Sequence, residues 1–174
     1  SQGAQAINDV MLACLEQWSG DELPLVWHQA GKEHFEEVKR QYQLVLPSAI
    51  VDDFISDMAP AYEWADIVIG RAGALTVSEI AAVGVASILI PFPHAVDDHQ
   101  YHNARLLEQQ GGAVIIRQQQ CTVHKLQEAL SGFMKNREKL IYISEANNRL
   151  EEKNVSAKIV ATCEHFFNKK RGLS

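Results

Sequence analysis

Short apolar runs that alternate with amphipathic helical stretches constrain the fold of this chain more than any other feature. The runs at residues 67–69 (Ile-Val-Ile) and 86–90 (Ala-Ser-Ile-Leu-Ile) are nearly continuous, which is typical of strands that are buried on both faces of a parallel sheet. Strands of this kind, separated by helices, indicate an α/β protein. We therefore predict a doubly wound parallel sheet of about six strands with helices on both faces.

The spacing of apolar residues also places the individual elements. Five strands are predicted within the chain, at residues 25–27, 49–55, 66–70, 86–92 and 113–116. Apolar stripes at helical spacing predict helices at residues 7–18, 31–42, 58–65, 75–83, 99–109, 123–134, 136–153 and 155–167. In such sheets ligands bind at the carboxyl ends of the strands, so the loops that follow the strands are the places to search for function.

The composition excludes several classes of protein. The 174 residues carry a net charge of −6, whereas a dedicated nucleic-acid-binding protein needs a basic face. No apolar run approaches the roughly 20 residues that span a bilayer as a helix. The three cysteines, Cys14, Cys121 and Cys163, are widely spaced, so we expect small buried apolar residues in a reducing cytoplasm and not a disulfide framework.

The first candidate loop is the start of the chain, where Ser1 precedes Gln-Gly-Ala and a helical pattern. We expect a strand to precede this loop in a longer protein. A small glycine-containing turn at a helix start presents backbone N–H groups to an anion such as phosphate. An ordinary serine N-cap explains the same residues equally well.

The second candidate loop is Gly-Arg-Ala-Gly at residues 70–73, between a buried strand and a helix. Gly73 permits a tight turn and a close approach of the backbone to a ligand. Thr76 and Glu79 have the spacing of a capping box, which is the structural interpretation. In the functional interpretation, the N–H groups of residues 74–76 bind a diphosphate and Glu79 accepts hydrogen bonds from a ribose. Arg71 would balance phosphate charge or form a surface salt bridge.

The third candidate loop, residues 91–103, is rich in hydrogen-bonding side chains. Its histidines and its aspartates, Asp97 and Asp98, raise the question of a metal site, but their spacing matches no established ligand motif. We therefore predict no metal, and we expect one of the two aspartates to be the N-cap of the next helix. Gln100 carries an amide that suits sugar hydroxyls.

These motifs together are specific. Residues 66–79 (DIVIGRAGALTVSE), the Pro-Phe-Pro at residues 91–93, the Asp-His-Gln at residues 98–100 and the Phe-Ile-Ser-Asp-Met at residues 54–58 resemble the nucleotide-sugar signature of the MurG family of N-acetylglucosaminyltransferases. The likeness is closest from Ser1 to about Gln118. It implies one Rossmann-like half of a GT-B glycosyltransferase, in which residues 1–174 form a single C-terminal donor-binding domain. Residues 154–170 would be the helix that returns to the N-terminal domain in the family.

The resemblance implies the donor and the residues that bind it. The donor would be UDP-N-acetylglucosamine, bound without a metal or another cofactor. Ile55 would read the uracil through its backbone, Glu79 would bind the ribose, and Gln100 would bind the sugar hydroxyls. The diphosphate would lie against Ser1 and the start of the helix, and the donor-binding residues would be Ser1, Ile55, Ala74, Leu75, Thr76, Val77, Ser78, Glu79 and Gln100, with Arg71 and His99 as weaker candidates.

The resemblance also implies the reaction, which converts lipid I to lipid II in peptidoglycan synthesis and so serves cell-wall biogenesis, cell shape and cell division. The acceptor site, the membrane contact and the catalytic residues would belong to the N-terminal half, so we expect this chain to bind donor without transferring sugar. The full protein would be peripheral, on the cytoplasmic face of the bacterial inner membrane.

Two other functions remain open at this point. One is a UDP-N-acetylglucosamine 2-epimerase of the same fold, which the Gly-Ala-Leu-Thr-Val-Ser-Glu run at residues 73–79 disfavours. The other is a metal-dependent hydrolase that would use the histidines His94, His99 and His102.

Overall fold

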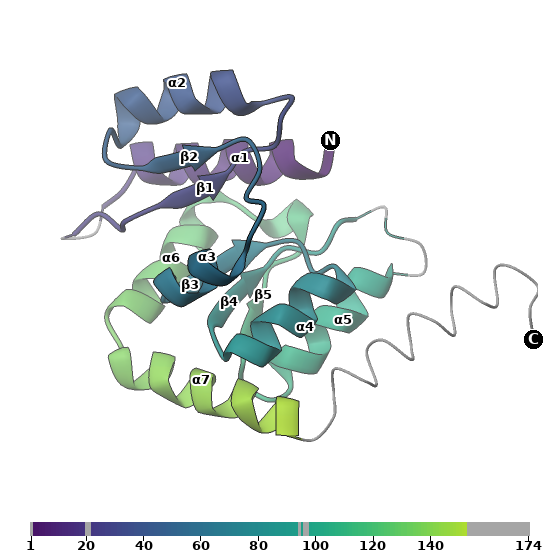
Figure 1. The fold of residues 1–174 in the computed structure, drawn as a ribbon. Helices are drawn as coiled ribbons and strands as arrows, with labels where there is room; N and C mark the ends of the chain where they lie inside the picture. The colour runs from purple at the N-terminus through teal and green to yellow at the C-terminus, as the bar shows by residue number, and fades with distance from the viewer. Residues whose placement is uncertain (1, 20–21, 94, 96–97, 153–174) are drawn as a thin grey trace, which may run out of the picture. The chain divides into compact units, whose positions relative to one another are not determined.

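The computed structural model describes residues 2–19, 22–93, 95 and 98–152, and the chain divides into two compact units (Figure 1). The first unit comprises the chain up to Trp64 together with Gln118–Lys135. The second comprises Ala65–Arg117 and the chain from Asn136 onward. Each unit has its own parallel sheet and its own helices.

The first unit contains a two-stranded parallel sheet, in which Trp27 of one strand lies opposite Ile50 of the other. Helix α1 packs against α2 and α6, and α2 packs against β2. Apolar positions at helical spacing turn these helices inward, since Val38 and Tyr42 of α2 and Leu126, Leu130 and Phe133 of α6 are buried. The elements are α1 (Gln2–Glu16), β1 (Trp27–Gln29), α2 (Phe35–Val45), β2 (Ile50–Asp52), α3 (Ala59–Trp64), the 3₁₀ helix η2 (Gln118–Gln120) and α6 (Val123–Met134).

A polar network is buried inside this unit. His28 of β1 has its Nδ1 atom 2.7 Å from the hydroxyl of Tyr42 and its Nε2 atom 2.9 Å from Oδ1 of Asn8. Asn8 in turn donates from Nδ2 to the carbonyl oxygen of Ala30 at 3.0 Å. Burial lowers the pKa of His28 from its ordinary value of 6.5 to about 4, so the ring is neutral near pH 7. The network therefore gives this buried histidine hydrogen-bond partners on both ring nitrogens.

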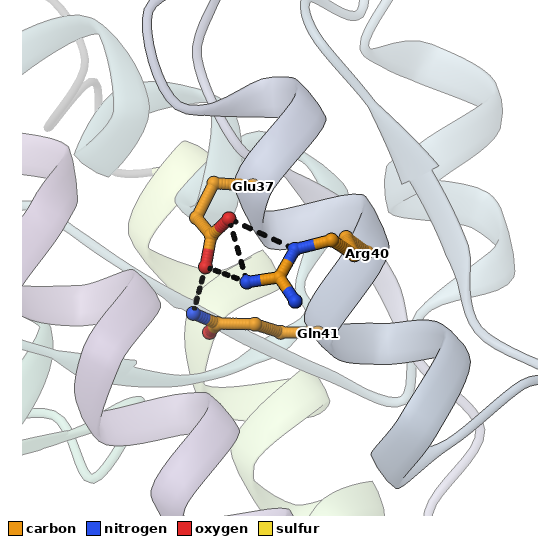
Figure 2. Close-up of polar contacts among 3 residues, drawn as sticks. All are labelled: Glu37, Arg40 and Gln41. Atoms are coloured by element: carbon orange, nitrogen blue, oxygen red, sulfur yellow. Dashed lines mark hydrogen bonds and ion pairs between the residues drawn. The ribbon is translucent and has the colours of Figure 1, made fainter.

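The outer surface of α2 is stabilised by local charge pairing. Arg40 donates to both carboxylate oxygens of Glu37, and Gln41 donates to one of them (Figure 2). These residues are three and four positions apart, which places them side by side on a helix. The Arg40 and Gln41 hydrogen bonds hold the pKa of Glu37 below its ordinary value. Because both charged side chains are more than half exposed, this pair contributes little to global stability.

The second unit contains a three-stranded parallel sheet in the order β3-β4-β5. Residues 86–89 of β4 are buried throughout, as expected for a central strand covered on both faces. Helix α4 joins β3 to β4 and packs against α5 and α7, and α5 packs against β5. The elements are β3 (Ile67–Gly70), α4 (Ala74–Val83), β4 (Ala86–Leu89), α5 (His99–Glu108), β5 (Ala113–Ile115) and α7 (Arg137–Glu152).

The predicted α/β class with parallel strands is confirmed, but the described strands form two sheets of two and three strands instead of one sheet of about six. The five strands found correspond to the five predicted segments, and the helices from α1 to α7 correspond to the first seven predicted helices. The first strand is displaced by two residues: it begins at Trp27, and Leu25 is exposed. Cys14 is fully buried, as predicted, whereas Cys121 is only half-buried, and Cys163 lies outside the described residues. The predicted helices at residues 155–167 and 154–170 lie outside the described residues, and the prediction of a single domain stays a prediction.

None of the helices in the described part of the chain is long and apolar enough to cross a membrane.

Candidate functional site

The second unit presents two loops at the carboxyl edge of its sheet. β3 and β4 are parallel neighbours, and Gly70 at the end of β3 lies opposite Leu89 at the end of β4. The loop after β3 leads into α4, and the loop after β4 leads toward α5. Because the two strands end at the same edge, the residues of these two loops share one neighbourhood.

Helix α4 begins without a side-chain cap. Gly73 occupies the N-cap position in an extended conformation, with φ −62° and ψ 150°, and no side chain caps the helix there. The first bond of the helix runs from the N–H of Val77 to the carbonyl of Gly73. The N–H groups of Ala74, Leu75 and Thr76 precede that bond and have no acceptor within the helix. The positive end of the helix dipole therefore faces the loop with three N–H groups that have no acceptor within the helix, which is an arrangement that binds anions.

The capping box considered for Thr76 and Glu79 is wrong. Thr76 is the third residue of α4, and Gly73 occupies the N-cap. A capping box needs the threonine at the N-cap itself, so this explanation of the motif no longer competes with ligand binding.

Neither Gly70, the last residue of β3, nor Gly73 is required to be glycine by the backbone conformation or by neighbouring atoms. Neither Gly70 nor Gly73 has a positive φ. A Cβ atom added at Gly70 would meet nothing within 4 Å, and one added at Gly73 would meet only the hydroxyl of Thr76 at 3.8 Å. The expected tight turn at Gly73 is therefore not the reason for the glycine. The open space beside both residues is consistent with the close approach of a ligand to the backbone.

Arg71 ties the first loop to the second. Its Nη1 atom donates to the carbonyl oxygens of Ile90 and Pro91, at 3.0 and 3.3 Å. Its guanidinium also lies over the ring of Phe92, 5.3 Å from the centroid. The structure thus places Nη1 of Arg71 on two backbone carbonyls, and the expectation that Arg71 balances phosphate charge stays a prediction.

Gln100 meets the same segment from α5. Its Oε1 atom accepts a hydrogen bond from the backbone N–H of Phe92 at 2.9 Å. Arg71 and Gln100, both singled out from the sequence, are thus brought together at Phe92. The bond to Phe92 uses the oxygen of the Gln100 amide, so Nε2 is the part of that amide suited to a sugar hydroxyl.

Asn103 provides a further connection that the sequence analysis missed as a site residue. This buried side chain donates from Nδ2 to the carbonyl oxygen of Ala72 at 3.2 Å. The burial of Asn103 and its contact with Ala72 are visible only in the structure. Asn103 follows the Asp-His-Gln motif at residues 98–100, but its spacing from that motif did not indicate a role.

Asp98 takes the N-cap position of α5 without capping it. Its backbone is left-handed, with φ 54°, and its side chain makes no cap hydrogen bond. One carboxylate oxygen accepts a hydrogen bond from Arg117 at 3.1 Å, and Arg117 also lies over the ring of Tyr101. The hydrogen bond that Arg117 donates to Asp98 raises the pKa of Arg117. An aspartate therefore occupies the N-cap position, as expected, but its side chain does not cap the helix.

The other predicted donor-binding residues are placed individually. Val77 is fully buried, Leu75 is 72% exposed, and Ser78 and Glu79 are half-buried on α4. His99 is exposed at the first position of α5. In the first unit, the N–H of Ile55 donates to Oε1 of Gln29 at 2.9 Å. Ser1, His94 and Asp97 lie outside the described residues, and among the described residues no group of three or more His, Cys, Asp or Glu side chains is arranged to hold a metal ion.

Comparisons with known proteins point to one family. The sequence profile described as the glycosyltransferase family 28 C-terminal domain matches residues 1–159. A protein of Coxiella burnetii named UDP-N-acetylglucosamine--N-acetylmuramyl-(pentapeptide) pyrophosphoryl-undecaprenol N-acetylglucosamine transferase is 48% identical over 96% of this chain and 47% of its own length. A protein of the same name from Psychromonas ingrahamii is 40% identical over 94% of this chain and 46% of its own length. The chain thus spans about half the length of the curated relatives it matches.

Solved structures give the same result. The crystal structure of Acinetobacter baumannii MurG matches with a TM-score of 0.75 and 36% identity, over 91% of this chain and 49% of that one. A glycotransferase of kitacinnamycin matches with a TM-score of 0.60 and 18% identity, over 92% of this chain and 38% of that one, and it supports the fold alone. The resemblance to the MurG family is thereby confirmed. Since the profile covers most of its residues, this chain belongs to the glycosyltransferase family 28 C-terminal domain family.

Proposed function

We propose that this chain is the donor-binding domain of an inverting N-acetylglucosaminyltransferase that uses UDP-N-acetylglucosamine to convert lipid I to lipid II. The names of the relatives support this substrate and reaction class. The single observation in the structure that carries the proposal is the uncapped start of α4 at Gly73.

The start of α4 suits a diphosphate leaving group. The N–H groups of Ala74, Leu75 and Thr76 offer donors at the positive end of the helix dipole, and Gly70 and Gly73 leave room for a ligand against the backbone. Transfer of the sugar releases UDP, whose diphosphate gains negative charge as the glycosidic bond breaks. Preorganised backbone donors stabilise such developing charge. No metal is therefore needed in the proposed mechanism.

The remaining donor-binding roles are assigned residue by residue. Glu79 accepts hydrogen bonds from the ribose, Gln100 binds the sugar hydroxyls, and Ile55 reads the uracil through its backbone. Ser1 adds a contact to the diphosphate. The side chain of Val77 takes no part, because it is fully buried, and its backbone N–H is already bonded to the carbonyl of Gly73.

The proposal leaves the acceptor to a different part of the full protein. We assign lipid I binding, membrane contact on the cytoplasmic face of the inner membrane and the catalytic residues to a proposed N-terminal half, since this chain spans only 47% of the length of its Coxiella burnetii relative. We therefore expect this chain alone to bind donor and to show no sugar transfer to a lipid acceptor.

Calorimetric titration of the chain tests the proposal. UDP-N-acetylglucosamine, UDP-glucose and ADP-glucose are titrated separately, each in the presence of EDTA. We expect the first to bind most tightly. Glu79→Ala is expected to weaken binding roughly tenfold to a hundredfold, because it removes two hydrogen bonds to a charged acceptor. Glu138→Ala is the matched control, since Glu138 is an exposed residue on α7 of the same unit.

The alternatives give different results. A metal-dependent site would bind only when EDTA is omitted and a divalent ion is supplied. An epimerase would convert UDP-N-acetylglucosamine to its 2-epimer, which is detectable by NMR in the titrated sample. Equal affinity for all three nucleotide sugars, or no effect of Glu79→Ala, would contradict the proposed donor site.

A further inference from the structure

We infer that Asn103 is a positioning residue for the donor site, because its hydrogen bond to Ala72 fixes the peptide that leads into α4 and so sets the direction of the Gly73 N–H. This inference rests on the proposed function. It adds a residue that would touch no donor atom and would act through the backbone of the loop after β3.

The contact joins two buried residues that are far apart in sequence. Asn103 is 8% exposed and Ala72 is fully buried. Nδ2 of Asn103 donates to the carbonyl oxygen of Ala72 at 3.2 Å, across 31 positions of sequence. Inside a protein such a bond is shielded from competition with water, and leaving the carbonyl without a donor would carry the cost of a buried unsatisfied group. The carbonyl of Ala72 is therefore held toward α5.

The geometry of the peptide unit carries this constraint to the site. The carbonyl of Ala72 and the N–H of Gly73 belong to one planar trans peptide, and no cis peptide is found among the described residues. In a trans peptide the C=O and N–H bonds point in opposite directions. With the Ala72 oxygen held toward α5, the N–H of Gly73 points away from α5. This N–H immediately precedes the three donors of Ala74, Leu75 and Thr76.

The loop has a second anchor, which restricts how the peptide could respond. Arg71, next to Ala72, donates to the carbonyls of Ile90 and Pro91. Glycine at position 73 removes the steric barrier that a side chain would set against rotation of this peptide. Something else must therefore fix the orientation, and Asn103 supplies it. Fixing donors before the ligand arrives reduces the entropy that binding must offset.

The first test needs no ligand. Asn103→Leu removes the donor at similar size, Asn103→Asp replaces it with an acceptor, and Gln109→Leu is the matched control on an exposed position at the end of the same helix. We expect both Asn103 variants to shift the amide resonances of Gly73 and Ala74 in ¹H–¹⁵N spectra and to speed their hydrogen exchange. The control should leave these resonances unchanged. Unchanged Gly73 and Ala74 amides in both folded Asn103 variants would overturn the inference.

The second test separates positioning from general damage. Dissociation constants for UDP and for uridine are measured by titration and by ligand-observed NMR. If Asn103 sets the phosphate donors, the Asn103 variants should weaken UDP binding about tenfold and leave uridine binding unchanged. Equal weakening of UDP and uridine would show a merely structural role and overturn the inference alone. Absence of UDP binding in the unaltered chain would overturn the proposed function and the inference with it.

Discussion

The buried histidine of the first unit should make the stability of this protein fall in mild acid. His28 is 8% exposed, and burial lowers its pKa from 6.5 to about 4. The unfolded chain therefore takes up a proton as the pH falls through 6.5, whereas the folded chain does not until about pH 4. Stability from this group is fully present above pH 6.5 and is lost progressively between pH 6.5 and pH 4.

The size of the effect follows from the shift. Each unit of pKa corresponds to about 1.4 kcal/mol, so the complete loss below pH 4 is about 3 kcal/mol, and the loss at pH 5 is about 2 kcal/mol. Burial makes the neutral ring the preferred form, and the hydrogen bonds fix its tautomer. Asn8 turns its NH₂ group to Ala30 and its oxygen to His28. Nε2 of His28 therefore carries the proton, and Nδ1 accepts from the hydroxyl of Tyr42.

Urea denaturation at pH 7.5, 6 and 5 measures this contribution. His28→Gln retains a donor and an acceptor and does not titrate, so the difference in pH dependence between it and the unaltered chain isolates the histidine from the carboxylates. His124→Gln is the matched control, since His124 is an exposed histidine of the same unit. If the unaltered chain and His28→Gln lose the same free energy of unfolding between pH 7.5 and pH 5, the reasoning is refuted.

Three further predictions use individual contacts. Gly73→Ala is expected to change the free energy of unfolding by no more than about 1 kcal/mol, because its Cβ would meet only ordinary contacts. The same substitution is expected to weaken UDP binding in titration, and unchanged affinity would show that no ligand approaches this glycine. Thr122→Ala should lower the free energy of unfolding by about 1 kcal/mol in urea denaturation, since the Thr122 hydroxyl caps α6 by accepting a hydrogen bond from the backbone N–H of Lys125. Thr122→Ser keeps the hydroxyl and should lower it much less. Gln127→Ala should cost roughly 1–2 kcal/mol, because Nε2 of Gln127 donates to the carbonyls of Cys14 and Gln17 at the end of α1; a loss no larger than for an exposed position of α6 would contradict this role.

Hydropathy predicts strands well where burial is apolar and poorly where it is polar. The run that contains Ile67 and the run that contains Ile88 were placed correctly, because both strands are mainly apolar, although β3 is only half-buried and β4 includes the buried Ser87. The strand that begins at Trp27 was placed two residues early, on Leu25 and Val26. Its inward residue is His28, whose burial depends on a tertiary network with Asn8 and Tyr42. No local pattern reports that network, since its members are 14 and 20 positions away from His28.

The motif after β3 was located correctly, but the capping interaction proposed for it is wrong. Sequence spacing suggested that Thr76 and Glu79 cap the helix and that Arg71 meets charge. The structure gives the N-cap to Gly73 and turns Arg71 to the carbonyls of Ile90 and Pro91. The spacing of residues within one segment cannot predict a hydrogen bond to a backbone carbonyl that follows the neighbouring strand. The predicted roles of Ile55, Glu79 and Gln100 in donor binding stay predictions.

The same contacts explain why a site of this kind is conspicuous as a motif and yet contains few obvious chemical groups. Its proposed chemistry depends on backbone N–H groups, which every residue except proline possesses and which no sequence pattern displays directly. The sequence instead specifies where the backbone must be uncovered, through Gly70 and Gly73, and where it must be held, through Arg71 and Asn103. Three of these four residues lie in four consecutive positions, which makes the motif specific, and the fourth, Asn103, lies on α5. Arg71 and Asn103 would thus support donor binding by fixing the shape of the loop. Arg71→Lys keeps the charge but changes the geometry of the donors, so it should impair UDP binding more than the loss of an exposed charge elsewhere.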